Sequence, residues 1–338
     1  MLVQRHTWFS TLTGFEERTY EETQANLEVV GRTLRSRING QSYVIGELQT
    51  PSVGELRARA LADAGRLAGR LRVASVTGDV ARLHDDAAHR HALFQVASQF
   101  NLLEMTGPDV RPEDGVTRYV HDRTQGPSCA MAAGAATIHR NYLMPVDGLA
   151  GQTAHRQVDG LRGIGTALGN AGQALWTMQN GYALCSDDGL AAITRTLAAM
   201  SAVERDALRD RLRVGVHWGV QVTAGARADQ LVSQAFCAAL PVSYTSVPSR
   251  RWAPFATLVL EGAYEATLWA AVLNARQHGS NVVFLTHLGG GAFGNERAWI
   301  DGAMRRALHL MQGLDLDVRI VSRGAPLSDV VQLVADFA

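Results

Sequence analysis

The stretch Asn281-Val-Val-Phe-Leu-Thr-His-Leu-Gly-Gly-Gly-Ala-Phe-Gly-Asn295 decides the fold. Its first eight residues form an uncharged, largely apolar run that predicts a buried strand over 281–288. A glycine-rich part follows directly, and a helix is predicted after it over 296–312. Three consecutive glycines let the backbone adopt positive φ and approach a ligand closely. The order of strand, glycine loop and helix therefore predicts a ligand-binding loop.

The helix after this loop should begin with free backbone N–H groups and the positive end of its dipole, which favour a phosphate or pyrophosphate. The loop is not a Walker A loop, because no Gly-Lys-Ser/Thr follows, and it lacks the Rossmann spacing. Phe293 interrupts the glycines, so we expect it to stack on a sugar or base and to lie outside the core. The expected ligand contacts in this loop are Gly289, Gly290, Gly291, Ala292, Phe293, Gly294 and Asn295.

The rest of the second half of the chain alternates between strands and helices. Strands are predicted over 213–223, 235–243 and 316–322, and helices over 255–278 and 327–337. Uncharged β-branched runs separated by helices indicate an α/β fold in three layers, α/β/α, with a mainly parallel mixed sheet. In such sheets ligands bind outside the carboxyl ends of the strands.

The first half of the chain divides near residue 70. Residues 71–338 form the predicted main domain, because strands over 71–76 and 91–97 continue the same pattern. Residues 1–70 are more charged and predict an N-terminal helical extension. The elements expected in the extension are helices over 16–36 and 54–71 and a short strand over 41–46. A helical insertion is expected around 148–210, in which residues 173–200 should be mainly helical.

Composition excludes several classes of protein. The 338 residues are 46% hydrophobic and 19% charged, which is typical of a folded globular chain. Basic and acidic residues balance at a formal charge of +0, so no overall field favours nucleic acid or an acidic membrane as a partner. The apolar run 255–275 contains Glu261 and Glu265, which indicates a buried helix. The N-terminal residues lack the apolar core of a signal peptide, so we expect a cytoplasmic protein.

Two further stretches carry side chains suited to chemistry. The short strand ending in Thr77-Gly78-Asp79 places a carboxylate at a strand tip, where it could accept hydrogen bonds from an exocyclic amine such as that of adenine. A plain turn is the alternative. The loop 112–129 carries three carboxylates, of Glu113, Asp114 and Asp122, ahead of a helix. Carboxylates in such a loop can activate water or stabilise a developing cation.

Two other chemistries could use residues of this region. Cys129 begins a helix, where a thiolate is favoured, and Gln125 could serve as an oxyanion donor. No papain-type signature accompanies them, and a buried cysteine at a helix start is commoner. The histidines and aspartates over 84–91 (His84, Asp85, Asp86, His89, His91) lack the spacing of a zinc motif. We therefore expect neither a metal nor a cofactor.

The order of these elements resembles a macrodomain, the ADP-ribose-binding α/β/α fold. Thr77-Gly78-Asp79-Val80 is similar to the family's Gly-Asp-Ile, which holds adenine. Phe94-Gln-Val-Ala-Ser-Gln-Phe-Asn101 occupies the place of its Val-Asn-Ala-Ala-Asn strand, which suggests Gln99 and Asn101 as ligand contacts. Thr286-His-Leu-Gly-Gly-Gly-Ala-Phe-Gly294 occupies the place of its diphosphate loop. Poly(ADP-ribose) glycohydrolases have a closer Gly-Cys-Gly-Ala-Phe-Gly there.

The chain departs from the glycohydrolases in one motif, because their Gly-rich run followed by Gln-Glu-Glu is absent. Tyr119-Val-His-Asp122-Arg-Thr-Gln-Gly-Pro stands in its place. This variant resembles divergent macrodomain hydrolases related to the Legionella effector MavL, which remove ADP-ribose from arginine. The resemblance implies a hydrolase acting on ADP-ribosylated protein, with a non-catalytic ADP-ribose reader as the alternative.

The resemblance also implies roles for individual residues. Asp122 would activate water or stabilise the cation, assisted by Glu113 or Asp114. Thr124 and Gln125 would contact the ligand, Asp79 would hold the adenine, and Phe293 would contact the distal ribose. ADP-ribose itself would be ligand or product.

Overall fold

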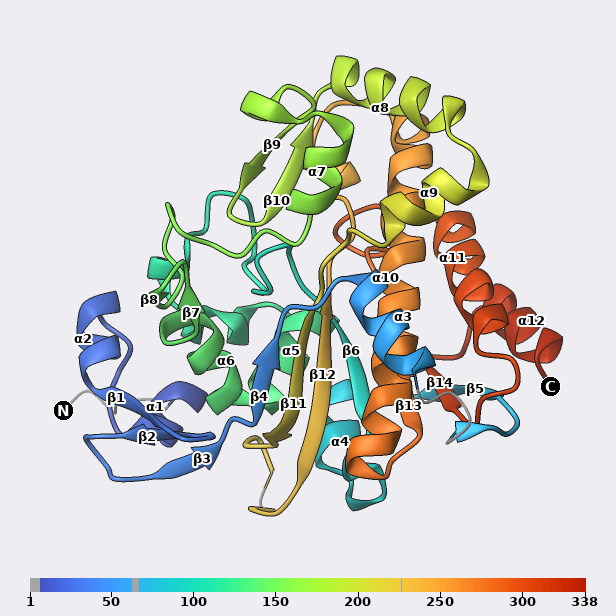
Figure 1. The fold of residues 1–338 in the computed structure, drawn as a ribbon. Helices are drawn as coiled ribbons and strands as arrows, with labels where there is room; N and C mark the ends of the chain where they lie inside the picture. The colour runs from blue at the N-terminus through green and yellow to red at the C-terminus, as the bar shows by residue number, and fades with distance from the viewer. Residues whose placement is uncertain (1–6, 63–66, 226) are drawn as a thin grey trace.

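A seven-stranded sheet forms the centre of the computed structural model, which describes residues 7–62, 67–225 and 227–338 (Figure 1). In spatial order its strands are β4 (Glu47–Gln49), β11 (Gly215–Gln221), β12 (Leu231–Cys237), β6 (Leu93–Ala97), β13 (Val282–Leu285), β14 (Asp317–Ser322) and β5 (Arg72–Thr77). Only β11 in this sheet runs against its neighbours, and the pairs from β12 to β5 are all parallel. The predicted mainly parallel mixed sheet is confirmed.

Helices cover both faces of this sheet. One face carries α3 (Val53–Leu61), α10 (Ser249–His278), α11 (Arg297–Leu310) and α12 (Ser328–Asp336). The other carries α4 (Val80–Asp85), α5 (Gln125–Ala132) and α6 (Gly134–Tyr142). Successive side chains of strand β6 point to opposite faces of the sheet. Leu93 packs into the core that contains α10, whereas Phe94 and Val96 pack into the core beside α5 and α6. The three-layer α/β/α prediction is confirmed.

Helix α10 is the central support of one layer. Among the described residues it is the one helix long and apolar enough to cross a membrane, but 89% of its most apolar window is buried inside the protein. Its face contacts strands β11, β12, β13 and β6 and helices α3 and α11. The predicted buried helix is therefore confirmed.

The N-terminal part contains more strand than predicted. After α1 (Trp8–Thr13) and α2 (Tyr20–Ala25), the chain forms a small antiparallel sheet of β1 (Leu27–Val30), β2 (Thr33–Ser36) and β3 (Ser42–Val44). Of the helix predicted over 16–36 only residues 20–25 are helical; the rest of that prediction is wrong, and Gly31 at φ 59° turns the chain between β1 and β2. Strand β4 then joins the edge of the central sheet. The domain boundary near residue 70 stays a prediction.

The predicted insertion begins with β7 (Pro145–Val146), β8 (Leu149–Ala150) and α7 (Arg162–Leu168). A hairpin of β9 (Trp176–Gln179) and β10 (Tyr182–Cys185) follows, then α8 (Asp187–Ala199) and α9 (Ala202–Arg209). The helix predicted over 173–200 is therefore wrong in its first half. Asn180 and Gly181, at φ 45° and 81°, form the Asn-Gly turn that favours a tight hairpin. This hairpin lies above the strand ends in Figure 1.

Candidate functional site

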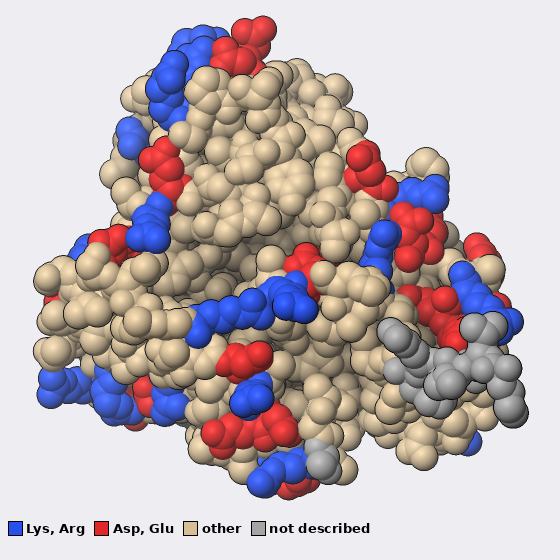
Figure 2. Space-filling model, turned by 180° about the vertical axis from the view of Figure 1, so that it is seen from behind, with Lys and Arg blue, Asp and Glu red and all other residues tan. Residues whose placement is uncertain are grey.

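A cavity of about 380 Å³ lies at the carboxyl ends of β5, β6, β13 and β14. Its lining includes residues that directly follow each of these strands, together with the start of α5 and Tyr182 of the β9–β10 hairpin. Figure 2 shows a hollow near the middle of one face, with positively charged side chains along its lower edge. All of these are arginines, because the chain contains no lysine. The cavity is at the edge of the sheet where the sequence predicted a ligand site.

The glycine loop forms one wall of the cavity. Gly289, Gly291, Ala292 and Phe293 line it. Gly289 has φ 74°, and a Cβ there would meet the Ala239 side chain at 2.5 Å, so only glycine fits. The backbone N–H groups of Gly291, Ala292 and Phe293 have no acceptor among the described residues. Three consecutive free donors at a cavity wall suit an anion.

Three of the predicted loop contacts do not line the cavity. The Gly290 N–H donates to the His287 carbonyl, and Gly294 packs against Ser243. The Asn295 side chain is buried and donates to the Leu240 carbonyl at 2.8 Å and the Gly289 carbonyl at 3.3 Å. These residues hold the loop in shape and leave ligand contact to their neighbours.

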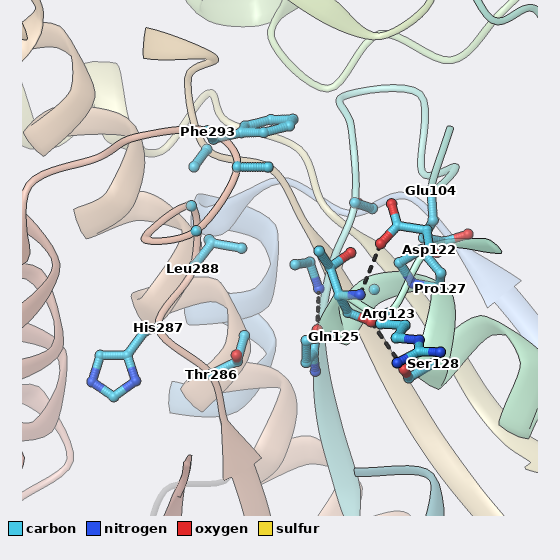
Figure 3. A pocket seen from close by; sticks show the side chains of 18 of the residues that line it. Glu104, Asp122, Arg123, Gln125, Pro127, Ser128, Thr286, His287, Leu288 and Phe293 are labelled. Atoms are coloured by element: carbon cyan, nitrogen blue, oxygen red, sulfur yellow. Dashed lines mark hydrogen bonds between the residues drawn. The ribbon is translucent and has the colours of Figure 1, made fainter. Parts of the chain in front are cut away.

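The start of α5 forms the opposite wall (Figure 3). The Gln125 side chain forms two hydrogen bonds with the backbone of β6, as a neighbouring strand would. Its oxygen accepts from the Ala97 N–H at 2.9 Å and its nitrogen donates to the Gln95 carbonyl at 2.7 Å. A Cβ at Gly126 would lie 2.0 Å from the Ala97 carbonyl oxygen, so glycine is required for this contact. The first N–H groups of a helix have no intrahelical acceptor and point outward. Thr124 and Gln125 both line the cavity, as predicted.

Asp122 is the predicted catalytic carboxylate that reaches the cavity. It is half-buried, and its Oδ1 accepts from the Thr124 N–H at 2.8 Å. This contact fixes the carboxylate at the entrance to α5. Its Oδ2 has no hydrogen-bond partner among the described side chains and backbone groups, so it can face a ligand or water.

Glu104 is a second carboxyl group in the lining, and the sequence analysis missed it. Both of its oxygens accept from Arg140 Nη2 at 2.9 Å, and both side chains are fully buried. Burial raises the pKa of Glu104 to about 7, although the Arg140 guanidinium opposes the rise. A carboxyl group with such a pKa can hold or release a proton near neutral pH. The available signal was a glutamate inside the apolar run 102–105.

Glu113 and Asp114, predicted to assist, lie outside the cavity lining. Both Glu113 oxygens accept from the Ala154 N–H, at 2.9 and 3.0 Å. Asp114 accepts from the Arg111 N–H at 2.8 Å and thereby closes the 3-10 turn that begins at Pro112. A second 3-10 turn, Thr117–His121, separates both of them from Asp122. The acidic loop therefore delivers one carboxylate to the cavity, while Glu113 ties the loop to Ala154 and Asp114 caps a turn.

Gln99 and Asn101 are buried supports of the loop that carries Glu104. Gln99 lines the cavity, but its side chain accepts from the Met105 N–H and donates to the Met105 carbonyl. Asn101 lies outside the lining; its oxygen accepts from the Leu103 N–H and its nitrogen donates to Gln157. We assign both residues to shaping the 99–105 loop.

Asp79 lines the far end of the cavity, at the tip of β5. It is exposed, and its Oδ1 accepts from the Ala81 N–H at 2.9 Å as the N-cap of α4. The cap leaves its Oδ2 available to a ligand. The same end of the cavity is lined by Val80, Val321 and Arg323.

Phe293 lines the cavity and also packs against the main core. Its ring centroid lies 5.3 Å from that of Tyr182 and 5.4 Å from that of Tyr244. Burial raises the pKa of Tyr182, and the neighbouring Tyr244 and Asp122 raise it further. As expected, Phe293 is not one of the buried core residues, but its ring packs against the core and against Tyr182 of the insertion hairpin, a partner that the sequence did not reveal.

The alternative chemistries find no support in this geometry. Cys129 is fully buried outside the lining, and burial raises the pKa of its thiol well above the ordinary value. It accepts a hydrogen bond from Gln125 Nε2 at 3.1 Å. His84 is buried with its ring stacked 3.7 Å from that of Phe94. Within the described ranges no three His, Cys, Asp or Glu side chains are arranged to hold a metal ion.

No protein-family model and no curated protein matches this sequence. The chain is similar, at low identity, to solved structures of poly(ADP-ribose) glycohydrolase. The Thermomonospora curvata protein bound to the inhibitor ADP-HPD is 15% identical with a TM-score of 0.44, over 94% of this chain and 96% of that chain. The Deinococcus radiodurans protein in complex with ADP-ribose is 14% identical with a TM-score of 0.44, over 86% and 92%. Activity has to be inferred from the residues of the cavity.

Proposed function

We propose that this protein hydrolyses the glycosidic bond between ADP-ribose and a modified protein side chain, with arginine as the acceptor. The observation that carries the proposal is the composition of a single cavity. It combines an exposed carboxylate at one end, a wall of free backbone N–H groups in the middle, and two carboxyl groups with an aromatic cluster at the other end. A base, a diphosphate and a distal ribose require these groups in this order.

In this proposal the ligand follows the strand ends. Asp79 accepts from the adenine amine at the tip of β5. The diphosphate lies between the N–H groups of Gly291 to Phe293 and the start of α5, where dipoles and free donors favour an anion. The distal ribose then lies between Phe293 and Asp122, which line facing walls in Figure 3.

The two carboxyl groups divide the chemistry. The bond from the anomeric carbon to the acceptor nitrogen breaks through an oxocarbenium-like state, which the Asp122 carboxylate stabilises. The oxygen of the attacking water bonds to the anomeric carbon while Asp122 takes a proton from that water. The departing guanidine is strongly basic and takes a proton from Glu104, whose raised pKa keeps it partly protonated near neutral pH. Solvent exchange restores both carboxyl groups.

Two features support a cationic acceptor. Asp122 and Glu104 make this end of the cavity acidic. The rings of Tyr182, Tyr244 and Phe293 lie beside them, and aromatic faces attract a guanidinium. The resemblance of the 119–127 motif to arginine-directed hydrolases agrees with this choice.

The test is incubation of the protein with arginine-, serine- and glutamate-linked ADP-ribosyl substrates, followed by measurement of free ADP-ribose. We expect release from the arginine linkage and its near loss in Asp122→Asn, with ADP-ribose binding retained. Release from another linkage only would retain the hydrolase and reject the arginine acceptor. Binding of ADP-ribose without release from any linkage would identify a reader. Activity retained in Asp122→Asn but lost in Cys129→Ser would replace this mechanism with thiol catalysis.

A further inference from the structure

Arg323 has a position in the cavity that the proposed function does not use. It follows β14 directly and lines the cavity, and its side chain is exposed. It forms no ion pair or side-chain hydrogen bond with any residue in 7–62, 67–225 or 227–338. Its backbone is held in place, because the Thr77 hydroxyl donates to the carbonyl of the next residue, Gly324, at 3.1 Å. A guanidinium is thus presented to the cavity from a fixed strand end.

The order of strands places this guanidinium between two parts of the ligand. In the sheet β14 lies between β13 and β5. The Gly291–Phe293 donors follow β13, and Asp79 follows β5. A nucleotide with its base at Asp79 and its diphosphate at the glycine loop must therefore cross the end of β14 with its adenosine ribose. Adjacent strands are about 4.8 Å apart, so Arg323 lies within one side-chain length of that ribose.

We propose that Arg323 forms a subsite for a phosphate group on the adenosine ribose, at its 2′ position, so that the protein accepts ADP-ribosyl groups carrying this extra phosphate. This inference rests on the proposed function, because it uses the same ligand path. The guanidinium fork matches a phosphate monoester with two parallel N–H···O bonds. Arginines next to the ribose select phosphorylated dinucleotides in other nucleotide-binding sheets for this reason.

Arg123 provides a matched control. It also lines the cavity and is exposed, but it precedes α5 on the side of Asp122. Its charge would act on the diphosphate, which both ligands share. Removal of Arg123 should weaken binding of both ligands alike, whereas removal of Arg323 should affect the phosphorylated ligand.

The experiment is calorimetric titration of the full chain with ADP-ribose and with ADP-ribose 2′-phosphate. We expect the wild type to bind the 2′-phosphate at least about tenfold more tightly at low salt, with the difference shrinking as salt screens the pair. Arg323→Gln should remove the difference and leave the Kd for ADP-ribose within about threefold. Arg123→Gln should keep the difference.

Two results would overturn the subsite and leave the proposed function standing. Equal affinities of the wild type for both ligands would show that no phosphate is recognised there, and this comparison needs no variant. Equal weakening of both ligands by Arg323→Gln would mean that the guanidinium stacks on the adenine. Failure of both ligands to bind would reject the ligand path and the proposed function together. Binding of ADP-ribose without a 2′ preference would reject the subsite alone.

Discussion

Two buried glutamates lie on opposite sides of the sheet and have different surroundings. Glu265 on α10 accepts from Arg57 of α3 at 2.8 Å, from Arg306 of α11 at 2.6 Å and from Trp269 at 3.0 Å. Glu104, next to the cavity, has one charged partner, Arg140. Both side chains of that pair are buried, and the pKa of Glu104 rises to about 7.

The difference separates a structural charge from a functional one. A buried carboxylate with donors from three side chains forms ion pairs and hydrogen bonds that join helices together. The network around Glu265 extends to Asp206 of α9, which pairs with both Arg57 and Arg306. Glu104 has fewer donors and lines the cavity, and in the proposed function it gives its proton to the leaving group. Substitutions in the two regions should therefore affect different measurements.

The largest effect is expected at the cavity, from Asp122→Asn. Loss of this carboxylate should lower the rate of ADP-ribose release about 10²–10⁴-fold, because charge stabilisation and water activation are both lost. The Kd for ADP-ribose and the Tm should change little. Asp114→Asn is the matched control in the same loop, and it should retain the rate. Similar losses in both variants would mean that the loop as a whole, and not the cavity carboxylate, carries activity.

On the structural side, Glu265→Gln should lower the free energy of unfolding by about 3 kcal/mol, the lower end of the range for a broken buried pair, because two half-buried arginines lose this anion but keep Asp206. Urea denaturation measures this change. The affinity for ADP-ribose per folded molecule should not change, since Glu265 does not line the cavity. Glu261→Gln, which removes a partly exposed partner of Arg209, should cost less. A loss of affinity for ADP-ribose in folded Glu265→Gln would contradict the view that the two regions act independently.

The third prediction concerns pH. Glu104→Gln should lower kcat/KM about 10²-fold or more at pH 6 and remove the decline that we expect for the wild type as pH rises through about 7. Its folded pKa lies above the ordinary value of about 4.5, so the folded state binds more protons between these pH values. The contribution of this group to stability therefore falls as pH rises through that window. An unaltered pH–rate profile in Glu104→Gln would assign the proton to another group; Glu113→Gln is the control.

The smallest effect is expected at the adenine end. Asp79→Ala should weaken ADP-ribose binding by about 1–3 kcal/mol through loss of a charged hydrogen bond. Asp86→Ala is a matched control, because Asp86 caps a helical turn with the same 2.9 Å bond but lies outside the cavity lining. Both variants should lose about 0.5–2 kcal/mol of stability as caps. Equal binding by the two variants would remove Asp79 from the ligand site.

Local patterns were sufficient for most strands of the sheet, for the buried helix α10 and for the edge of the sheet that carries the cavity, but they did not indicate β4 and placed the start of β12 four residues too late. Side chains point to the same face every 2.0 residues along a strand and every 3.6 residues along a helix. Burial of one face therefore leaves a regular apolar pattern in the sequence. The glycine loop and Asp79 were found in the same way, since a strand end is recognisable without its neighbours. The β9–β10 hairpin was missed although Asn180-Gly181 is a strong local signal, because the flanking segments were interpreted as helix.

Contacts between distant segments decided which polar residues form the cavity. Glu113, Asp114 and Asp122 look alike in sequence, yet the Ala154 and Arg111 N–H groups bind the first two outside the cavity, whereas one Asp122 oxygen stays free. Glu104 depends on Arg140, 36 residues away, for a buried ion pair that no local pattern indicates. Arg323 is next to the adenosine ribose in our proposal because β14 lies between β13 and β5. Strand order, burial and partner choice are set by packing of the whole chain, so they appear only once it is folded.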